Sequence, residues 1–260
     1  MTPYFSRAVV CGTVFFLATG ASAQTESGYT FGVSVQSLGD KGKNGKPLML
    51  KASVAGRNGR VDVIQGDDEY KTGDFVITND GGETFWAVSP KKKQAERMSP
   101  ETVRKLIRKE DFAVKNVSLS PPAPTGTGET VVGIAAKSFR YSRNYMITAS
   151  VLFFSSKINV AETWDFQVAP PSASVPAFNP AVSYLALTKS AILFKNDAYA
   201  TTGYKAMLPA GFAVKVVTEA GATIGKKRER EGSVITCDVI VPAPLDASLF
   251  RVPNGFKRRE

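Results

Sequence analysis

Hydrophobic and polar residues alternate with a period of two along most of the chain. Tyr29, Phe31, Val33 and Val35 occupy every second position of the first such stretch, which is typical of a strand with one buried face. The same pattern, interrupted by turns rich in Gly, Asn and Asp, predicts further strands at 48–54, 61–63, 75–77, 84–88, 112–119, 129–141, 145–154, 157–168, 213–220, 223–231 and 234–241. Turns that recur about every 8–12 residues are typical of a β-sandwich or a β-barrel.

One short segment follows the helical period instead. Ser99 and Pro100 provide an N-cap and a first-turn proline, and Val103, Leu106 and Ile107 then fall on one face. This arrangement predicts an amphipathic helix from Pro100 to about Lys109.

A second helix is predicted from Pro180, after the N-cap Asn179. Apolar residues cover so much of its circumference that we expect it to be buried on several sides. Strands and helices do not alternate as βαβ units, so the sheet should be antiparallel. The pattern therefore predicts a mainly β (α+β) fold with about ten or eleven strands and two helices.

The first 23 residues have the pattern of a secretory signal peptide. Arg7 provides a positive charge, residues 8–19 form an apolar stretch, and Ala21-Ser22-Ala23 is an A-x-A cleavage site. The apolar stretch is too short for a membrane span. We therefore expect a periplasmic or secreted protein.

The mature chain would have 260 − 23 = 237 residues, which fits a single domain over 24–260. Two segments rich in proline interrupt the strand pattern. The stretch 120–128 (SPPAPTGTG) predicts a soft internal linker, and 169–180 predicts a proline-rich loop.

The chain contains no histidine. This absence excludes Ser-His-Asp and Cys-His catalytic sites and zinc sites that include histidine. Cys11 would leave with the signal peptide, so Cys237 cannot form an intrachain disulfide in the mature chain. We expect Cys237 to be a small buried residue, with a reactive or intermolecular thiol as the alternative. No metal or other cofactor is expected.

The chain is strongly basic, with 33 Lys and Arg against 23 Asp and Glu. Removal of Arg7 with the signal leaves 32 − 23 = +9. A location outside the cytoplasm makes nucleic acid an unexpected partner. Peripheral contact with an anionic membrane surface fits better, and solubility alone is the other explanation.

Four short motifs connect the chain to a known group of proteins. The motif at 128–136 (GETVVGIAA) is similar to a Gly-Glu stretch of that group, and Glu162-Thr163-Trp164 is similar to its Trp-bearing strand. Leu208-Pro209-Ala210-Gly211 is similar to its Leu-Pro turn, and 250–256 (FRVPNGF) is similar to its C-terminal motif. On these motifs the chain resembles the superfamily of bacterial outer-membrane lipoprotein carriers, especially its uncharacterised periplasmic relatives. The resemblance implies a single unclosed antiparallel β-barrel wrapped around short helices.

An open barrel of this kind can leave an apolar groove on its concave face. A buried acyl chain gains about 0.8 kcal/mol per CH₂, which is enough to hold a lipid without any catalytic group. The alternative is that the candidate residues pack against the helices as an ordinary core. The candidates are Phe31, Val33, Leu50, Ile77, Phe85, Trp86, Phe154 and Trp164.

Charged residues give two further candidate sites. Asp67-Asp68-Glu69 together with Asn79-Asp80 could supply oxygen ligands for calcium, although solvated turn residues explain them better because no EF-hand spacing is present. Three basic runs, 91–93, 226–230 and 257–259, could form one patch for anionic head groups. The alternative for 226–231, where the charges alternate in sign at the end, is a protected edge strand.

These observations favour a non-catalytic periplasmic binding or carrier protein for a hydrophobic ligand, either a lipid or an acylated protein. We expect a monomer. The alternative is a structural or sensing module of the envelope that binds a partner protein through a sheet edge. A hydrolase that uses paired carboxylates is a third hypothesis.

Overall fold

The computed structural model describes residues 25–39, 46–107, 111–151, 154–172, 174–197 and 199–260. The predicted signal peptide lies outside these residues. The strands are β1 (Thr25–Gly39), β2 (Leu48–Ala55), β3 (Asn58–Gln65), β4 (Phe75–Thr78), β5 (Phe85–Ser89), β6 (Gln94–Met98), β7 (Phe112–Val131), β8 (Ile134–Val151), β9 (Phe154–Ala169), β10 (Phe212–Ile224), β11 (Lys227–Cys237), β12 (Val241–Asp246) and β13 (Lys257–Arg259). The helical segments are η1 (Pro90–Lys92), α1 (Pro100–Ile107), α2 (Pro180–Lys189), η2 (Ala191–Lys195), η3 (Tyr199–Gly203), α3 (Tyr204–Met207) and η4 (Ala247–Phe250).

All thirteen strands belong to one sheet that does not close into a barrel. Its order is β13-β6-β5-β4-β3-β2-β1-β11-β10-β9-β8-β7, and β12 pairs with β1 beside this path. The prediction of a mainly β protein with one unclosed sheet is therefore confirmed. The predicted antiparallel pairing has one exception, because β13 runs parallel to β6. Strands β6 and β13 were missed because their polar and basic sequences show no hydrophobic alternation.

Several predicted strand boundaries are wrong. Strand β8 continues through the break predicted between Tyr141 and Tyr145, and the predicted strand 223–231 contains the turn between β10 and β11. The predicted strand 129–141 contains a hairpin turn at Val132 and Gly133, which both have positive φ. The predicted linker 120–128 lies inside β7, where the pairing with β8 shifts register between Ser120 and Ala123 and again between Pro124 and Gly126. Strand β11 continues through the break predicted after Glu231. Proline and glycine thus mark register irregularities here and do not end the strand.

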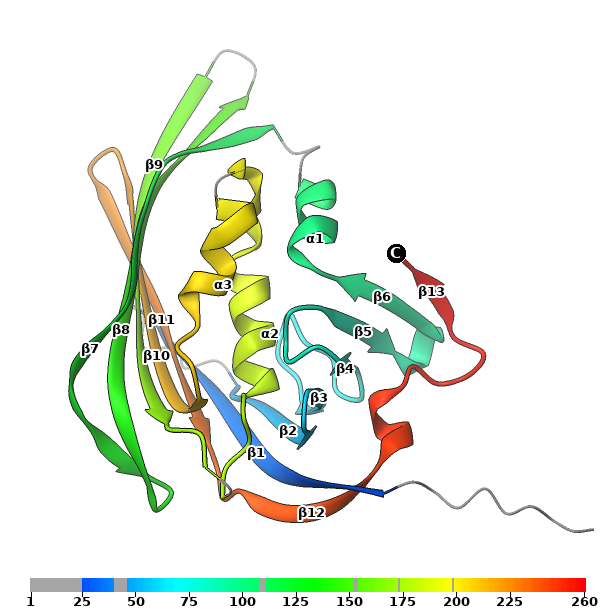
Figure 1. Cartoon of the computed structure of the whole chain (residues 1–260). Helices are drawn as coiled ribbons and strands as arrows, with labels where there is room; N and C mark the ends of the chain where they lie inside the picture. The colour runs from blue at the N-terminus through cyan, green and yellow to red at the C-terminus, as the bar shows by residue number, and fades with distance from the viewer. Residues whose placement is uncertain (1–24, 40–45, 108–110, 152–153, 173, 198) are drawn as a thin grey trace, which may run out of the picture.

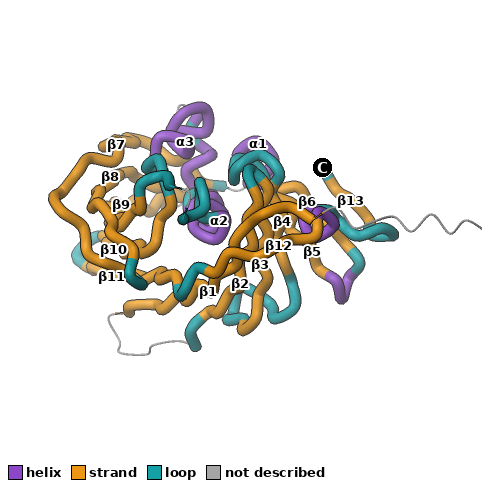
Figure 2. Tube along the Cα trace, turned by 60° about the horizontal axis from the view of Figure 1, so that its bottom comes forward, coloured by secondary structure: helices purple, strands orange, loops and turns teal. Residues whose placement is uncertain are grey.

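The long strands β7 to β11 curve around α2 and α3 (Figures 1 and 2). Both predicted helices are present, although the expected end of the first, Lys109, lies outside the described residues. Helix α2 begins as predicted, since the Asn179 side chain accepts hydrogen bonds from the amides of Ala181 and Val182. Seven of the ten residues of α2 are buried, which confirms the expectation that the sheet and other segments cover it. Among the described helices, none is long and apolar enough to span a bilayer.

A second, smaller core lies on the outer face of the short strands. Phe85 joins the main core, whereas its neighbour Trp86 packs in the second cluster, because successive strand residues point to opposite faces. The C-terminal segment covers this outer face with Phe250 and Val252. The short strands therefore have their inner face toward α2 and their outer face under the C-terminal segment.

Candidate functional site

The eight residues predicted to line a groove do not share one surface. Four of them, Phe31, Val33, Phe85 and Trp164, are almost fully buried in the main core. Ile77 and Trp86 contribute to the second cluster on the outer face. Phe154 lies in β9, and its side chain is outside the described part of the structure. Among the seven whose side chains are described, Leu50 borders the pocket described next. The alternation identified buried positions correctly, but it could not tell filled space from empty space.

The pocket that Leu50 borders lies between the inner face of β2–β6 and helix α2. Its volume is about 240 Å³. Leu48, Leu50, Val61 and Val63 form an aliphatic wall, and Leu185 of α2 also borders it.

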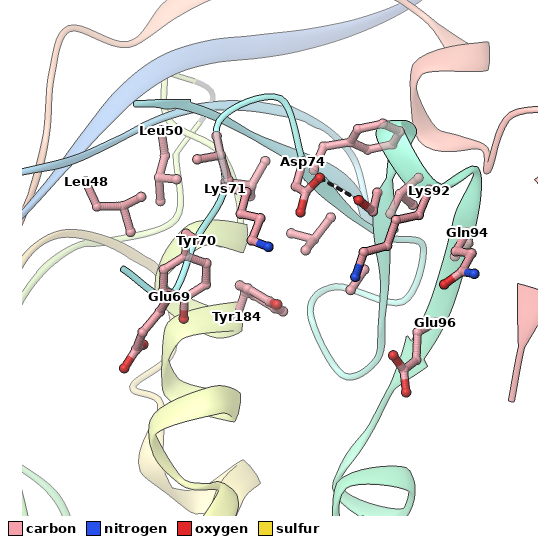
Figure 3. A pocket seen from close by; sticks show the side chains of 18 of the residues that line it. Leu48, Leu50, Glu69, Tyr70, Lys71, Asp74, Lys92, Gln94, Glu96 and Tyr184 are labelled. Carbon is pink, nitrogen blue, oxygen red and sulfur yellow. Dashed lines mark hydrogen bonds between the residues drawn. The ribbon is translucent and has the colours of Figure 1, made fainter. Parts of the chain in front are cut away.

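The mouth of the pocket carries charged and polar groups. Figure 3 shows Lys71 and Lys92 extending toward each other, while the carboxylates of Glu69 and Glu96 point away from the two ammonium groups. Asp74 also borders the pocket and accepts a hydrogen bond from the Ser89 hydroxyl at 2.9 Å. Gln94 and Arg259 complete this mouth. The pocket is therefore amphipathic, with an apolar wall and a polar opening.

The loop between β3 and β4 holds Lys71 in place. The Asp67 carboxylate accepts hydrogen bonds from the amides of Glu69 and Tyr70 at 2.9 and 2.8 Å. At the other end of the loop, the Gly73 amide donates to the Val63 carbonyl at 2.9 Å. Asp67 is thus a turn-forming residue, as its sequence context suggested.

Two tyrosines form the side of the pocket next to α2. The Tyr70 hydroxyl lies 3.1 Å from the Thr188 hydroxyl. The rings of Tyr70 and Tyr184 meet edge to face with centroids 6.2 Å apart, and Tyr184 meets Phe85 in the same way at 5.3 Å. Burial raises the pKa of both Tyr70 and Tyr184. Both phenols therefore stay protonated and can donate a hydrogen bond.

The second acidic cluster also has a structural role. The Asp80 carboxylate accepts hydrogen bonds from the Thr78 and Thr84 hydroxyls and from the Glu83 and Thr84 amides. Burial alone would raise the pKa of Asp80, but these bonds hold it below its ordinary value. No group of three or more metal-binding side chains occurs within the described residues.

A buried arginine, which the sequence pattern did not indicate, lies outside this pocket. Arg143 is fully buried on the concave face and forms an ion pair with Glu162, with Nε 2.7 Å from Oε2. It also donates to the Ser190 hydroxyl at 2.8 Å and the Tyr199 hydroxyl at 2.9 Å. Arg143 thus links β8 and β9 to the helical segments. Arg143 was not expected in the core, because residues 142–144 lay between two predicted strands, whereas β8 runs through them.

Cys237 is buried, as predicted. Asn179 donates from Nδ2 to its sulfur at 3.1 Å, and burial raises the pKa of the thiol to about 12. The thiol is therefore protonated near neutral pH.

Two of the three basic runs meet at one edge of the sheet. Lys93 follows η1, and its carbonyl accepts a hydrogen bond from the Lys257 amide at 2.9 Å, which places 91–93 beside 257–259. The third run lies on the β10–β11 hairpin, on the far side of the molecule (Figure 1). The prediction of one patch from all three runs is therefore wrong. The edge-strand alternative fits only 227–230, since β11 pairs with both β10 and β1 from Glu231 onward.

The long edge of the sheet is β7. Pro121, Pro122 and Pro124 lie within it and lack the amide hydrogen that a further strand would need. Asn116 has a positive φ at another shift of register. These features are typical of an edge that resists the addition of another strand.

Comparisons with known proteins do not extend this description. No protein-family model matches the chain, and the search of curated proteins finds no match either. The resemblance to lipoprotein carriers therefore stays a prediction, and the site has to be interpreted from its own geometry.

Proposed function

We propose that this protein is a non-catalytic, extracytoplasmic binding or carrier protein for a hydrophobic ligand, and that the pocket between β2–β6 and α2 holds the ligand. The observation that carries this proposal is the aliphatic wall of Leu48, Leu50, Val61 and Val63 around about 240 Å³ of free space. The extracytoplasmic location rests on the predicted signal peptide at 1–23.

The volume limits the ligand. Pockets for drug-sized ligands have roughly 300–1,000 Å³, so this pocket fits a smaller group. A methylene takes about the volume of one water in the liquid, about 30 Å³, so about eight carbons fit. At about 0.8 kcal/mol per CH₂, their burial gives about 6 kcal/mol before ordering costs. A short acyl chain, free or at the end of a larger molecule, is the expected occupant.

A chain-length series tests this proposal. The affinity of the protein for fatty acids should rise about fourfold with each added CH₂ of the acyl chain. The increase should stop near eight carbons, when the pocket is full. Val63→Trp would fill the pocket and should abolish binding, whereas Ile64→Trp, at a neighbouring exposed position, should not. Calorimetric titration of both variants gives the comparison. Equal binding by both, or no dependence on chain length, would contradict the proposal.

The basic edge formed by 91–93 and 257–259 supports a related proposal. Lys92 and Arg259 belong both to this edge and to the mouth of the pocket. Contact with an anionic membrane surface through this edge would bring the mouth close to the bilayer, where acyl ligands are found. Each Lys or Arg near such a surface contributes about 1 kcal/mol.

A further inference from the structure

We infer that the pocket selects amphiphiles with a single anionic head group, which Lys71 and Lys92 hold between their ammonium groups. This inference rests on the proposed function, because it assigns the head group of the ligand whose chain the aliphatic wall would bind. The head group is a carboxylate or a phosphate monoester.

The first observation is the direction of the two lysines. Lys71 comes from the β3–β4 loop and Lys92 from η1, yet both extend into the same mouth from opposite sides (Figure 3). Two ammonium groups that share a space repel each other, and an anion between them reverses the sign of the interaction. Charge-assisted hydrogen bonds to a carboxylate or phosphate are the contacts that this arrangement favours.

The second observation is that neither lysine forms an ion pair with any described residue. Elsewhere on the surface, Lys105 pairs with Glu101 at 3.0 Å and Lys215 pairs with Glu129 at 2.9 Å. At the mouth, Asp74 already accepts the Ser89 hydroxyl. Asp74 keeps its negative charge, but neither it nor Glu69 nor Glu96 forms an ion pair with either lysine, so both ammonium groups are available to a ligand.

The third observation is the phenol of Tyr184. Its ring is packed against Phe85 and Tyr70, and it borders the pocket from α2. No hydrogen bond links its hydroxyl to another described side chain or carbonyl. Burial first, and then the negative groups nearby, raise the pKa of Tyr184, so the hydroxyl remains a donor. It provides a third hydrogen bond to the same anion.

Four ligands with the same eight-carbon chain separate the head group from the chain: octanoate, octyl phosphate, octanol and octylamine. In calorimetric titrations of the full chain at low salt, octanoate or octyl phosphate should bind about tenfold more tightly than octanol, because two exposed ion pairs contribute about that much. Octylamine should bind more weakly than octanol. The anion that binds more tightly, octanoate or octyl phosphate, identifies the head group as a carboxylate or a phosphate monoester.

The variant Lys71→Met/Lys92→Met should reduce the affinity for octanoate and octyl phosphate to the affinity that the same variant has for octanol. Lys91→Met/Lys93→Met is the matched control, because these lysines flank Lys92 but do not line the pocket; it should keep the preference. Circular dichroism and thermal unfolding verify that both variants fold.

The outcomes distinguish the two proposals. Equal affinity for octanoate, octyl phosphate and octanol would overturn the head-group inference and leave the proposed function intact. A preference for octylamine would also overturn it, since the acids at the mouth would then dominate. Failure of all four ligands to bind would overturn the proposed function itself.

Discussion

The long-stranded region, β7 to β11, and the short-stranded region, β2 to β6, belong to one sheet but differ in how the inner face is packed. In the long-stranded region, Trp164, Phe166 and Tyr141 are almost completely buried and belong to the same core cluster as residues of the helical segments. In the short-stranded region, the inner face carries Leu and Val and a cavity remains beside α2. Large aromatics on the inner face of the long strands are buried in the filled core, whereas an aliphatic wall borders the pocket in the short-stranded region. The proposed binding pocket lies in the region whose wall includes Leu48, Leu50, Val61 and Val63.

The largest effect is expected at the buried ion pair of the long-stranded region. Arg143→Met leaves the Glu162 carboxylate without its partner, and loss of one member of a buried pair costs about 3–5 kcal/mol. Arg140→Met on the same strand breaks only the exposed pair with Asp165 and should cost less than about 1 kcal/mol. Urea unfolding measures both variants. Equal losses would show that Arg143 does not hold the helices to the sheet.

Truncation of a valine to alanine should lower the free energy of unfolding less at the pocket than in the filled core. Val216 is fully buried in the long-stranded region, and Val63 borders the pocket. Val216→Ala should lower the free energy of unfolding by about 2–3 kcal/mol and Val63→Ala by about 1 kcal/mol, because Val63 has fewer neighbouring atoms to lose. Chemical denaturation measures the difference. A larger loss at Val63 would mean that the pocket is not empty space.

Much of this contrast was not accessible from the sequence. The alternation around Phe31 and Val33 predicted buried strands correctly, and Asn179-Pro180 predicted the start of α2, because these are local signals. Arg143 could not be predicted, since its partners Glu162 and Tyr199 come from distant parts of the chain. The pocket was missed for the same reason.

Alkaline pH should destabilise the folded state. Burial raises the pKa of Cys237 to about 12 from an ordinary value of 9.0, and it also raises those of Tyr145 and Tyr204. The folded state keeps these protons at a pH where the unfolded chain has lost them, so stability is complete below pH 9 and falls as the pH rises above it. We expect a loss of about 1 kcal/mol by pH 10. Urea midpoints between pH 8 and pH 10 measure this loss, and Cys237→Ala should reduce it. A urea midpoint that stays the same between pH 8 and pH 10 would contradict this prediction.

The smallest effect on stability is expected at the basic edge beside the pocket. Lys91→Gln/Lys93→Gln/Lys257→Gln should change the free energy of unfolding by less than about 0.5 kcal/mol. Its affinity for anionic vesicles should fall by about 3 kcal/mol, or about a hundredfold. Matched substitution of Lys226, Lys227 and Arg228 on the β10–β11 hairpin should weaken vesicle binding less. Co-sedimentation measures both variants. A larger loss from the hairpin variant would place the membrane contact on the long-stranded region.

The most direct test of the account is to locate a short acyl ligand by methyl NMR. Addition of octanoate should shift the methyl signals of Leu48, Leu50, Val61 and Val63 in a saturable way and leave those of Leu187 and Val216 in the filled core unchanged. Shifts confined to the filled core, or no saturable shift in either region, would show that the pocket is not where this protein binds its ligand.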